Sequence, residues 1–262
     1  MLKYFHFARI AFGDHMSNRL RMFTRFLIYL VLLWVMVEMW RVIYHSGHAP
    51  HDIPFVDMAW YMGIAQMMFF LSPRLFVIID DDVRSGNLGY FLNRPIPYLW
   101  MRFTEGGGAL CGNVLIYYSA GTLLAYLYIG ELPSNGWGAL VLVMVLIFVA
   151  SLIHLLFQVI SGLSALWTND AIFIYHSYQK MFLLLGGIYV PISLYPDFMG
   201  GTFLKFLPFA AMVGDPCSLF LSGHTDGFWS ILALQIFWLI AVGAGAWAMF
   251  GRALRKVEIN GG

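Results

Sequence analysis

Residues 79–108 read IDDDVRSGNLGYFLNRPIPYLWMRFTEGGG and form the one long polar interval in an otherwise apolar chain. The charged residues of this interval are Asp80, Asp81, Asp82, Arg84, Arg94, Arg102 and Glu105. Its apolar residues are grouped as on one buried face of a short helix, at Val83, Leu88, Tyr90, Phe91 and Leu92. A merely solvated connector is the alternative, but it would be shorter. We therefore expect the interval to dock on a separate soluble protein.

The composition places the rest of the chain in a membrane. Hydrophobic residues make up 60% of the 262 residues and charged residues 11%, whereas soluble domains average about 25% charged. The net charge of +1 argues against a nucleic-acid partner, because a duplex binder needs a concentrated basic face. The two cysteines indicate no disulfide framework. We expect an all-α integral membrane protein, with residues 1–262 as a single membrane domain.

Six apolar segments are long enough to cross a hydrocarbon core of roughly 30 Å. We predict spans at 26–44, 58–79, 106–130, 137–163, 178–196 and 228–250. Residues 1–25 mix basic and aromatic side chains, a pattern typical of an amphipathic helix in the headgroup layer. Residues 80–105 then form a cytoplasmic loop. With both termini cytoplasmic, thirteen of the 15 Lys and Arg residues lie inside, as the positive-inside rule requires.

Prolines interrupt the fifth span and the segment after it. Pro191, Pro196 and Pro208 lie in an otherwise apolar region, and proline breaks a helix because it lacks an N–H and clashes with the preceding turn. Seven full crossings would export the C-terminal basic cluster, so we interpret 178–196 as one span and 197–224 as an outer re-entrant or interfacial segment. We also expect Pro73 to kink the second span.

One pair of charges lies near the outer end of the first span. Glu38 and Arg41 are three residues apart, so they share a helix face and can form an ion pair. The pair is either structural or part of an outer gate. The cost of unpaired charge in a membrane favours the structural interpretation.

The chain offers no strong catalytic or metal-binding motif. His45, His48 and His51 are spaced by three, but they lack an ordered acidic or cysteine partner, so a metal site is only weakly indicated. Ser164 follows Gly162-Leu163, with His154 and His176 as the nearest histidines. A serine hydrolase could use such residues, but in membrane helices small-residue triplets are typically packing surface. We expect no catalytic residue and no metal site.

The chain also lacks a P-loop. The Gly-Lys pair that a P-loop requires is absent, because the four lysines follow Leu2, Gln179, Leu204 and Arg255. No carboxylate pair lies in the middle of a span, as a proton relay would require. The chain is therefore not expected to bind ATP in this way by itself.

Two motifs resemble those of the type-two ATP-binding-cassette (ABC) export permeases. The segment Asp82-Val83-Arg84-Ser85-Gly86-Asn87-Leu88, followed by Leu92-Asn93-Arg94-Pro95, is similar to that family's "E-x-R-S-G-x-L … L-x-R-P" signature. The segment from Ile188 to Pro208 is similar to its "G-x-x-x-P-x-x-x-x-P … L-P" segment. Asp82 stands where many relatives have Glu. The similarity covers nearly the whole chain and is greatest to permeases encoded apart from their ATPase.

The resemblance implies an interfacial N-terminal helix, six spans, a broken fifth element and a coupling helix that enters a groove on a nucleotide-binding subunit. It implies two cytoplasmic ABC ATPases carrying ATP and Mg, no cofactor in this chain, a second permease copy or a related permease, and the bacterial inner membrane. The expected coupling residues are Asp80, Asp81, Asp82, Arg84, Gly86, Leu88, Phe91, Arg94 and Pro95. We hypothesise that Arg84 and Arg94 orient the coupling helix, so that charge reversal uncouples hydrolysis from transport.

The function expected from the sequence is the permease subunit of an ATP-driven exporter. The low-charge, aromatic-rich interior favours an amphipathic or lipid-like cargo. The alternative is a membrane anchor or assembly scaffold that recruits a cytoplasmic partner without transport. A membrane hydrolase acting through Ser164 is the third possibility.

Overall fold

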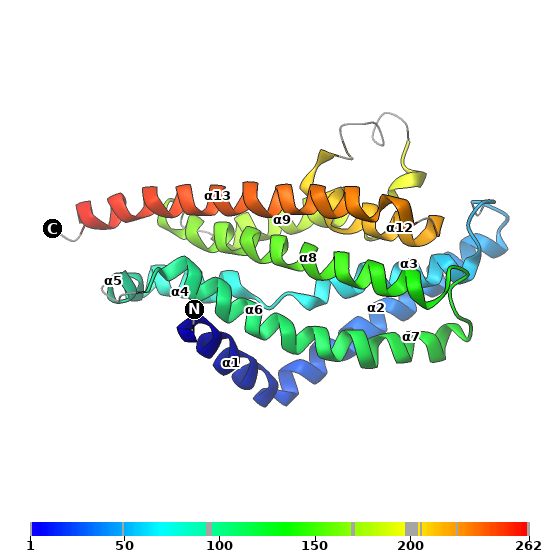
Figure 1. Cartoon of the computed structure of the whole chain (residues 1–262), viewed down its shortest axis with the longest axis horizontal. Helices are drawn as coiled ribbons and strands as arrows, with labels where there is room; N and C mark the ends of the chain where they lie inside the picture. Colours follow the sequence, from blue (N-terminus) through cyan, green and yellow to red (C-terminus); the bar gives the residue numbers. More distant parts are fainter. Residues whose placement is uncertain are drawn as a thin grey trace.

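The computed structural model (Figure 1) describes residues 2–48, 50–92, 96–168, 171–196, 204, 206–223 and 225–260. Helix makes up 85% of the structure, and these ranges contain no strand, which confirms the all-α fold. Within them, five helical segments are long and apolar enough to cross a membrane: Arg19–His45, Phe55–Arg84, Tyr98–Ile129, Gly136–Leu166 and Phe228–Leu254. Five of the expected spans fall on these segments. The protein is therefore a multi-pass membrane protein.

The N-terminal half contains α1 (Leu2–Ser17), α2 (Arg19–His45), α3 (Phe55–Leu71), α4 (Leu75–Arg84), α5 (Asn87–Leu92), α6 (Tyr98–Ile116), the π-helix η1 (Tyr117–Gly121) and α7 (Thr122–Ile129). The C-terminal half contains α8 (Gly136–Leu163), η2 (Ser164–Leu166), α9 (Ala171–Leu185), η3 (Ile192–Leu194), the π-helix η4 (Ala210–Gly214), α12 (Asp215–Ser222), η5 (Thr225–Gly227) and α13 (Phe228–Asn260). The loop expected over 80–105 is thus shorter, because α4 continues to Arg84 and α6 begins at Tyr98.

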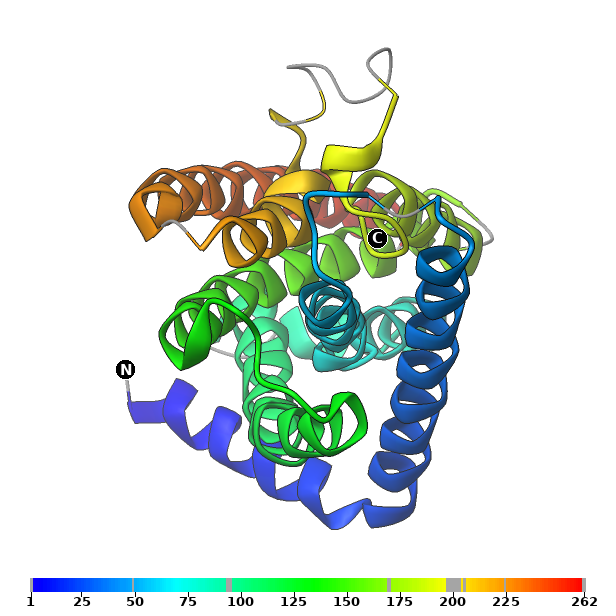
Figure 2. The same cartoon turned by 90° about the vertical axis from the view of Figure 1, so that its right-hand side faces the viewer.

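The helix expected over residues 1–25 ends at Ser17, and the chain turns at Asn18, whose side chain accepts a hydrogen bond from the Arg21 N–H. Figure 2 shows α1 running across α6. The two helices approach closely at Gly108, where a Cβ atom would lie 2.1 Å from the Ala8 carbonyl oxygen. Only glycine allows this approach. The N-terminal helix is therefore packed on the helical bundle.

A hydrogen bond of 2.7 Å joins His15 Nε2 to Asn113 Oδ1 and fastens the end of α1 to α6. Burial lowers the pKa of His15, and the nearby charges of Arg25 and Arg21 lower it further, although the hydrogen bond to Asn113 opposes them. The imidazole is therefore neutral at neutral pH. A neutral imidazole can make this contact without bringing a buried charge to the interface.

The kink expected at Pro73 is a full break between α3 and α4. The helix α3 ends at Leu71, and Ser72 has an extended backbone with ψ of 130°. The residue before a proline is biased to this conformation because the proline ring clashes with its backbone. The helix resumes at Leu75. The second membrane segment is therefore two rods joined at residues 72–74.

Polar side chains from other helices satisfy the carbonyl groups that this break leaves free. The Nη2 atom of Arg25 donates to the oxygens of Phe70 and Ser72, at 2.9 and 3.0 Å. Asn113 Nδ2 donates to the oxygen of Leu71 at 2.7 Å. Carbonyls at a helix end need such partners when water is excluded. Hydrogen bonds from α2 and α6 therefore stabilise the break.

The fifth element is broken, as expected, but earlier in the chain. The helix α9 has 15 residues and ends at Leu185, which gives a length of about 22 Å, too short to span the hydrocarbon core by itself. Pro191 precedes the single turn η3, and Pro196 follows this turn. Pro208 lies two residues before the π-helix η4. Residues 197–203 lie outside the described part of the chain.

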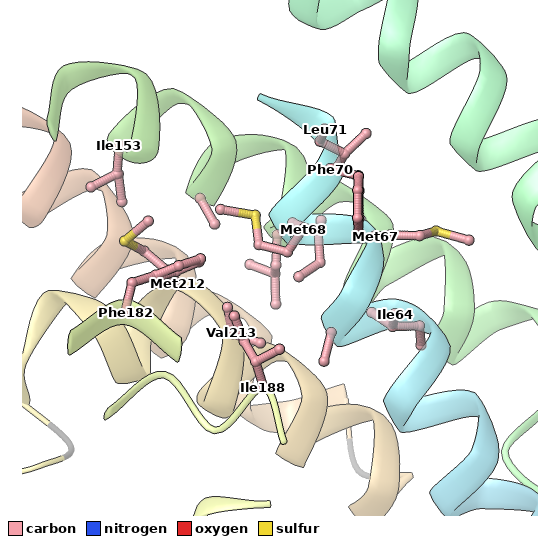
Figure 3. Close-up of a cluster of buried hydrophobic side chains, with 14 of the residues drawn as sticks. Ile64, Met67, Met68, Phe70, Leu71, Ile153, Phe182, Ile188, Met212 and Val213 are labelled. Carbon is pink, nitrogen blue, oxygen red and sulfur yellow. The ribbon is translucent and has the colours of Figure 1, made fainter. Parts of the chain in front are cut away.

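The core is centred on α3. An apolar 18-residue stretch of the segment Phe55–Arg84 is 78% buried, against 22% of the corresponding stretch in α2 and 17% in the last long helix. The helix α3 is therefore central, and the other two helices form the outer faces of the bundle (Figure 2). Figure 3 shows Met68 on α3 near Met212, Val213 and Phe182, which come from the broken fifth region. Unbranched methionine fills the irregular gaps that broken helices leave.

Candidate functional site

The polar interval forms a compact helical cap at one end of the molecule. We call α4, α5 and the first two turns of α6 (Tyr98–Glu105) the polar cap. A sharp turn at Ser85 and Gly86 joins α4 to α5, and Gly86 has a φ of +74°, which glycine adopts without strain. Figure 1 shows the cap at the same end as the N-terminus and the C-terminal end of α13.

A buried ion-pair network fixes the cap. Asp82 Oδ2 accepts hydrogen bonds from the Tyr98 hydroxyl at 2.6 Å and from Arg102 Nε at 2.8 Å. Arg102 Nη2 also lies 2.6 Å from the same oxygen, and Arg102 Nη1 donates to Glu105 Oε2 at 2.6 Å. The guanidinium thus holds two carboxylates at once. Buried charge is tolerated only when it is paired in this way.

Aromatic rings enclose the guanidinium of Arg102. Its carbon atom Cζ lies 4.8 Å from the centre of the Phe91 ring and 5.5 Å from that of Tyr98. Tyr98 also stacks on Phe250 of α13, with ring centres 5.7 Å apart. Cation–π contacts of this kind strengthen when water is excluded. The contact between Tyr98 and Phe250 therefore joins the cap to the last helix.

The inward face of α5 contains the two apolar residues expected to be important for coupling. Leu88 is 2% exposed, and Phe91 is half-buried against Arg102 and Tyr98. Tyr90, which the sequence grouped with them, is 64% exposed. The helix is thus amphipathic, with a tyrosine on its outer face.

The three consecutive aspartates have different surroundings. Asp82 is buried in the network with Arg102. Asp80 is buried and forms an ion pair of 2.8 Å with Arg84, whose side chain is 46% exposed. Asp81 is exposed. Only one of the three aspartates is therefore presented outward.

Around the turn between α4 and α5, the exposed residues of the cap are Asp81, Arg84, Ser85, Gly86, Asn87 and Tyr90. The cap also exposes the apolar side chains of Val77 and Ile78 on α4 and of Trp100 on α6. Arg94 and Pro95, also expected to be coupling residues, lie outside the described residues. The part around the turn combines one aromatic ring, one carboxylate, one guanidinium and small polar groups. Such a combination suits a protein contact better than a bilayer.

Tyr98, Glu105 and Phe250 were not assigned to the coupling site from the sequence, and Arg102 was noted only as a charge. Tyr98, Arg102 and Glu105 are spaced by four and three, so helical periodicity could have shown that they share a face. Phe250 lies about 150 residues from Tyr98 in the chain, a contact between helices far apart in sequence that no local pattern indicates.

The pair Glu38 and Arg41 lies at the opposite end. Arg41 Nη1 donates to Glu38 Oε1 at 2.7 Å, and the Tyr128 hydroxyl donates to the same oxygen. Arg41 also lies over the Phe55 ring at 5.5 Å. These contacts join α2, α3 and α7. A shallow pocket of about 250 Å³ adjoins the pair, lined by Arg41, Tyr44, His45 and Phe55.

The structure does not assemble the residues of a serine hydrolase. The Ser164 hydroxyl donates to the Ser161 carbonyl at 2.6 Å, and His154 Nδ1 bonds to the Tyr178 hydroxyl at 2.5 Å. His176 is exposed and bonds to Gln179. Neither histidine therefore contacts the hydroxyl it would have to activate.

Two of the three histidines between α2 and α3 make local contacts. His45 Nδ1 lies 2.7 Å from the Arg41 carbonyl oxygen, and His48 Nδ1 lies 3.2 Å from the Ser46 hydroxyl. Within the described ranges, no group of three His, Cys, Asp or Glu side chains is arranged to hold a metal ion.

Comparison with known proteins identifies the chain. A family model described as ABC-2 family transporter protein matches residues 24–261, which include the polar cap, four of the five long helices in full and the first long helix from residue 24 onward. A comparison with curated proteins finds no match. Members of the family are transport subunits that have no ATPase domain of their own and associate with an ABC ATPase. The chain is therefore a membrane permease that belongs to the ABC-2 transporter family.

Proposed function

We propose that the chain is the permease subunit of an ATP-driven exporter and that the polar cap is its coupling element. The supporting observation is the Asp82–Arg102 network, which joins α4 to α6 and packs against Phe91 of α5, while Tyr90 and Asp81 face outward. A partner that pushes on α5 would therefore move two membrane segments as one body. Rigid transmission of this kind suits a lever.

In this proposal two cytoplasmic ATPases, which carry ATP and Mg, bind one cap on each of two permease copies. The second copy is either identical or a related permease. Closure of the ATPases opens a path between the copies, near the first, second and fifth membrane elements. The cargo is an amphipathic or lipid-like molecule that leaves the cell across the bacterial inner membrane.

We infer six crossings with both termini in the cytoplasm. Five long helices are present in the described chain, and α9 with the residues after it would supply the sixth. Figure 1 places both ends of the chain beside the polar cap, as an even number of crossings requires if the cap is cytoplasmic. Segment 197–224 then lies on the outer side.

Tyr90→Ala should reduce the amount of ATPase that copurifies with the tagged chain from its native host. An aromatic anchor in an interface is worth about 2 kcal/mol or more, or roughly thirty-fold in Kd. The measurement is mass spectrometry of the stoichiometric partners in mild detergent. Trp229→Ala is the matched control, because Trp229 is 73% exposed and opens α13 at the opposite end from the cap.

Each outcome of this purification has a distinct meaning. A P-loop protein that copurifies with the wild type and with Trp229→Ala, and is lost from Tyr90→Ala, supports the exporter. The absence of an ATPase from an otherwise intact complex would favour the scaffold alternative.

Exchange of Glu38 and Arg41 should leave transport intact. Both side chains are partly exposed, at 34 and 39%, so we expect the free energy of unfolding to change by less than about 1 kcal/mol. The single variant Arg41→Glu is the control, since it places two carboxylates on one helix face. Thermal unfolding and cargo efflux are the measurements. A stable exchange variant without efflux would instead identify the pair as a gate.

A further inference from the structure

Arg25 is a half-buried cation whose hydrogen-bonding capacity is only partly used. Its Nη2 atom caps the broken end of α3 through the Phe70 and Ser72 oxygens. Its Nε and Nη1 atoms make no hydrogen bond to any described residue. A guanidinium has five N–H donors in a planar fork that matches phosphate and carboxylate oxygens. Part of this fork therefore remains available to a ligand.

The charges around Arg25 are positive. Arg74 lies two residues after Ser72, whose carbonyl oxygen accepts the hydrogen bond from Arg25, and Arg21 lies one turn before Arg25 on α2. Among the described residues, the ion pairs to carboxylates involve Arg41, Arg84 and Arg102. Neither Arg25 nor Arg74 forms such an ion pair with a described residue. Arginines gathered without a counter-anion repel each other, and a bound anion would relieve this repulsion.

The surroundings of this cation cluster suit a molecule with one charged end. Phe76, two residues after Arg74, stacks on Tyr175 of α9 with ring centres 3.7 Å apart. Along α2, Leu27, Ile28 and Val31 are 48, 46 and 51% exposed. An exposed apolar strip thus runs from Arg25 toward the middle of the bilayer. A headgroup at the arginines would place an acyl chain along this strip.

We propose that Arg25 and Arg74 bind the phosphate headgroup of an anionic amphipathic molecule at the break between α3 and α4. The site lies between the first, second and fifth membrane elements. The site therefore suggests what the proposed exporter carries, and the conclusion that the bound molecule is cargo rests on the proposed function. Binding itself needs neither ATP nor the partner, so it can be tested separately.

Arg74→Ala should weaken the binding of an anionic phospholipid to the purified full chain. Removing a charge-assisted contact to phosphate should raise the Kd about five- to tenfold. Arg74 is exposed, and its side chain makes no cap hydrogen bond on α4, so the fold should survive. Binding is measured by native mass spectrometry in detergent, with dioleoyl phosphatidylglycerol as the probe and dioleoyl phosphatidylcholine as the neutral reference.

Arg19→Ala is the matched control. Arg19 is exposed on the same helix as Arg25, but it lies six residues before Arg25, at the start of the helix. We expect its Kd to stay within about twofold of wild type, because a non-specific surface charge is largely screened at physiological salt. Equal losses in the two variants, or equal affinity for the two lipids, would overturn the proposal.

A competition experiment identifies the source of the phosphate, and a second variant keeps the test informative if one variant misfolds. Inorganic phosphate at millimolar concentration should not displace the lipid, and displacement would assign the site to free phosphate instead. Arg25→Lys should also weaken binding, because lysine keeps the charge but loses the fork. If Arg25→Lys does not fold, the lipid affinity of Arg74→Ala still tests the proposed site. Loss of lipid binding with normal ATPase copurification would separate this site from the coupling function.

Discussion

Arg102→Met should be among the most damaging single substitutions in the polar cap. It leaves Asp82 buried, at 6% exposure, with only the Tyr98 hydroxyl as its partner, and it leaves Glu105 unpaired. Removing one member of a buried ion pair costs about 3–5 kcal/mol. We therefore expect a marked fall in the thermal stability of the detergent-purified protein. The amount of copurifying ATPase should also fall, since α5 loses its support.

Two further variants identify the cause. Asp81→Asn removes a charge from the same cap, but Asp81 is exposed, so the loss should stay below about 1 kcal/mol. The double variant Asp82→Asn with Arg102→Met removes both charges and should regain part of the stability. If Arg102→Met and Asp81→Asn lower the thermal stability equally, the buried network does not fix the cap.

Gly108→Ala should release α1 from α6. The new Cβ atom would lie 2.1 Å from the Ala8 carbonyl oxygen, a separation at which backbone must move. Overpacking typically costs about 1–3 kcal/mol, and here most of this cost should fall on the docking of α1. Hydrogen exchange followed by mass spectrometry should show lower protection of the α1 amides, because the His15–Asn113 hydrogen bond is lost as well.

Gly107→Ala is the control for this effect. A Cβ atom at Gly107 meets nothing within 4 Å, so alanine there removes the same helical glycine without a clash. Alanine is favoured over glycine in a helix by about 1 kcal/mol, and we expect equal or greater protection than in wild type. Unchanged exchange of α1 in Gly108→Ala would show that the close approach does not hold the helix.

The polar interval shows how far local pattern can predict a site. The sequence located a short amphipathic helix at the right place, and Leu88 and Phe91 are its inward residues. The sequence also counted three aspartates as alike, whereas the structure buries two and exposes one. Periodicity tells which residues share a face of one helix. It does not tell which other helix will supply a counter-charge.

The broken elements show a similar limit. Pro73 indicated a kink, and proline sterics account for the full break that follows. The carbonyls freed by that break are satisfied by Arg25 and Asn113, which lie 40 or more residues away in the chain. The end of α9 at Leu185 was likewise placed too late by the sequence, because uncharged residues continue beyond the last helical turn.

The sequence by itself determined that this protein is an all-helical membrane protein, because runs of some 20 apolar residues are stable in a bilayer as helices. The permease assignment rested on the resemblance of two motifs to a known family. The sequence also predicted where the chain leaves the membrane, since charged residues and prolines separate the apolar segments. Only the tertiary structure decided that Arg102 secures the polar cap, that Gly108 receives α1, and that Arg25 caps the break beside Arg74 without an ion pair to a described carboxylate. These are contacts between helices, and the sequence records the length and polarity of each helix but not the neighbour it will meet.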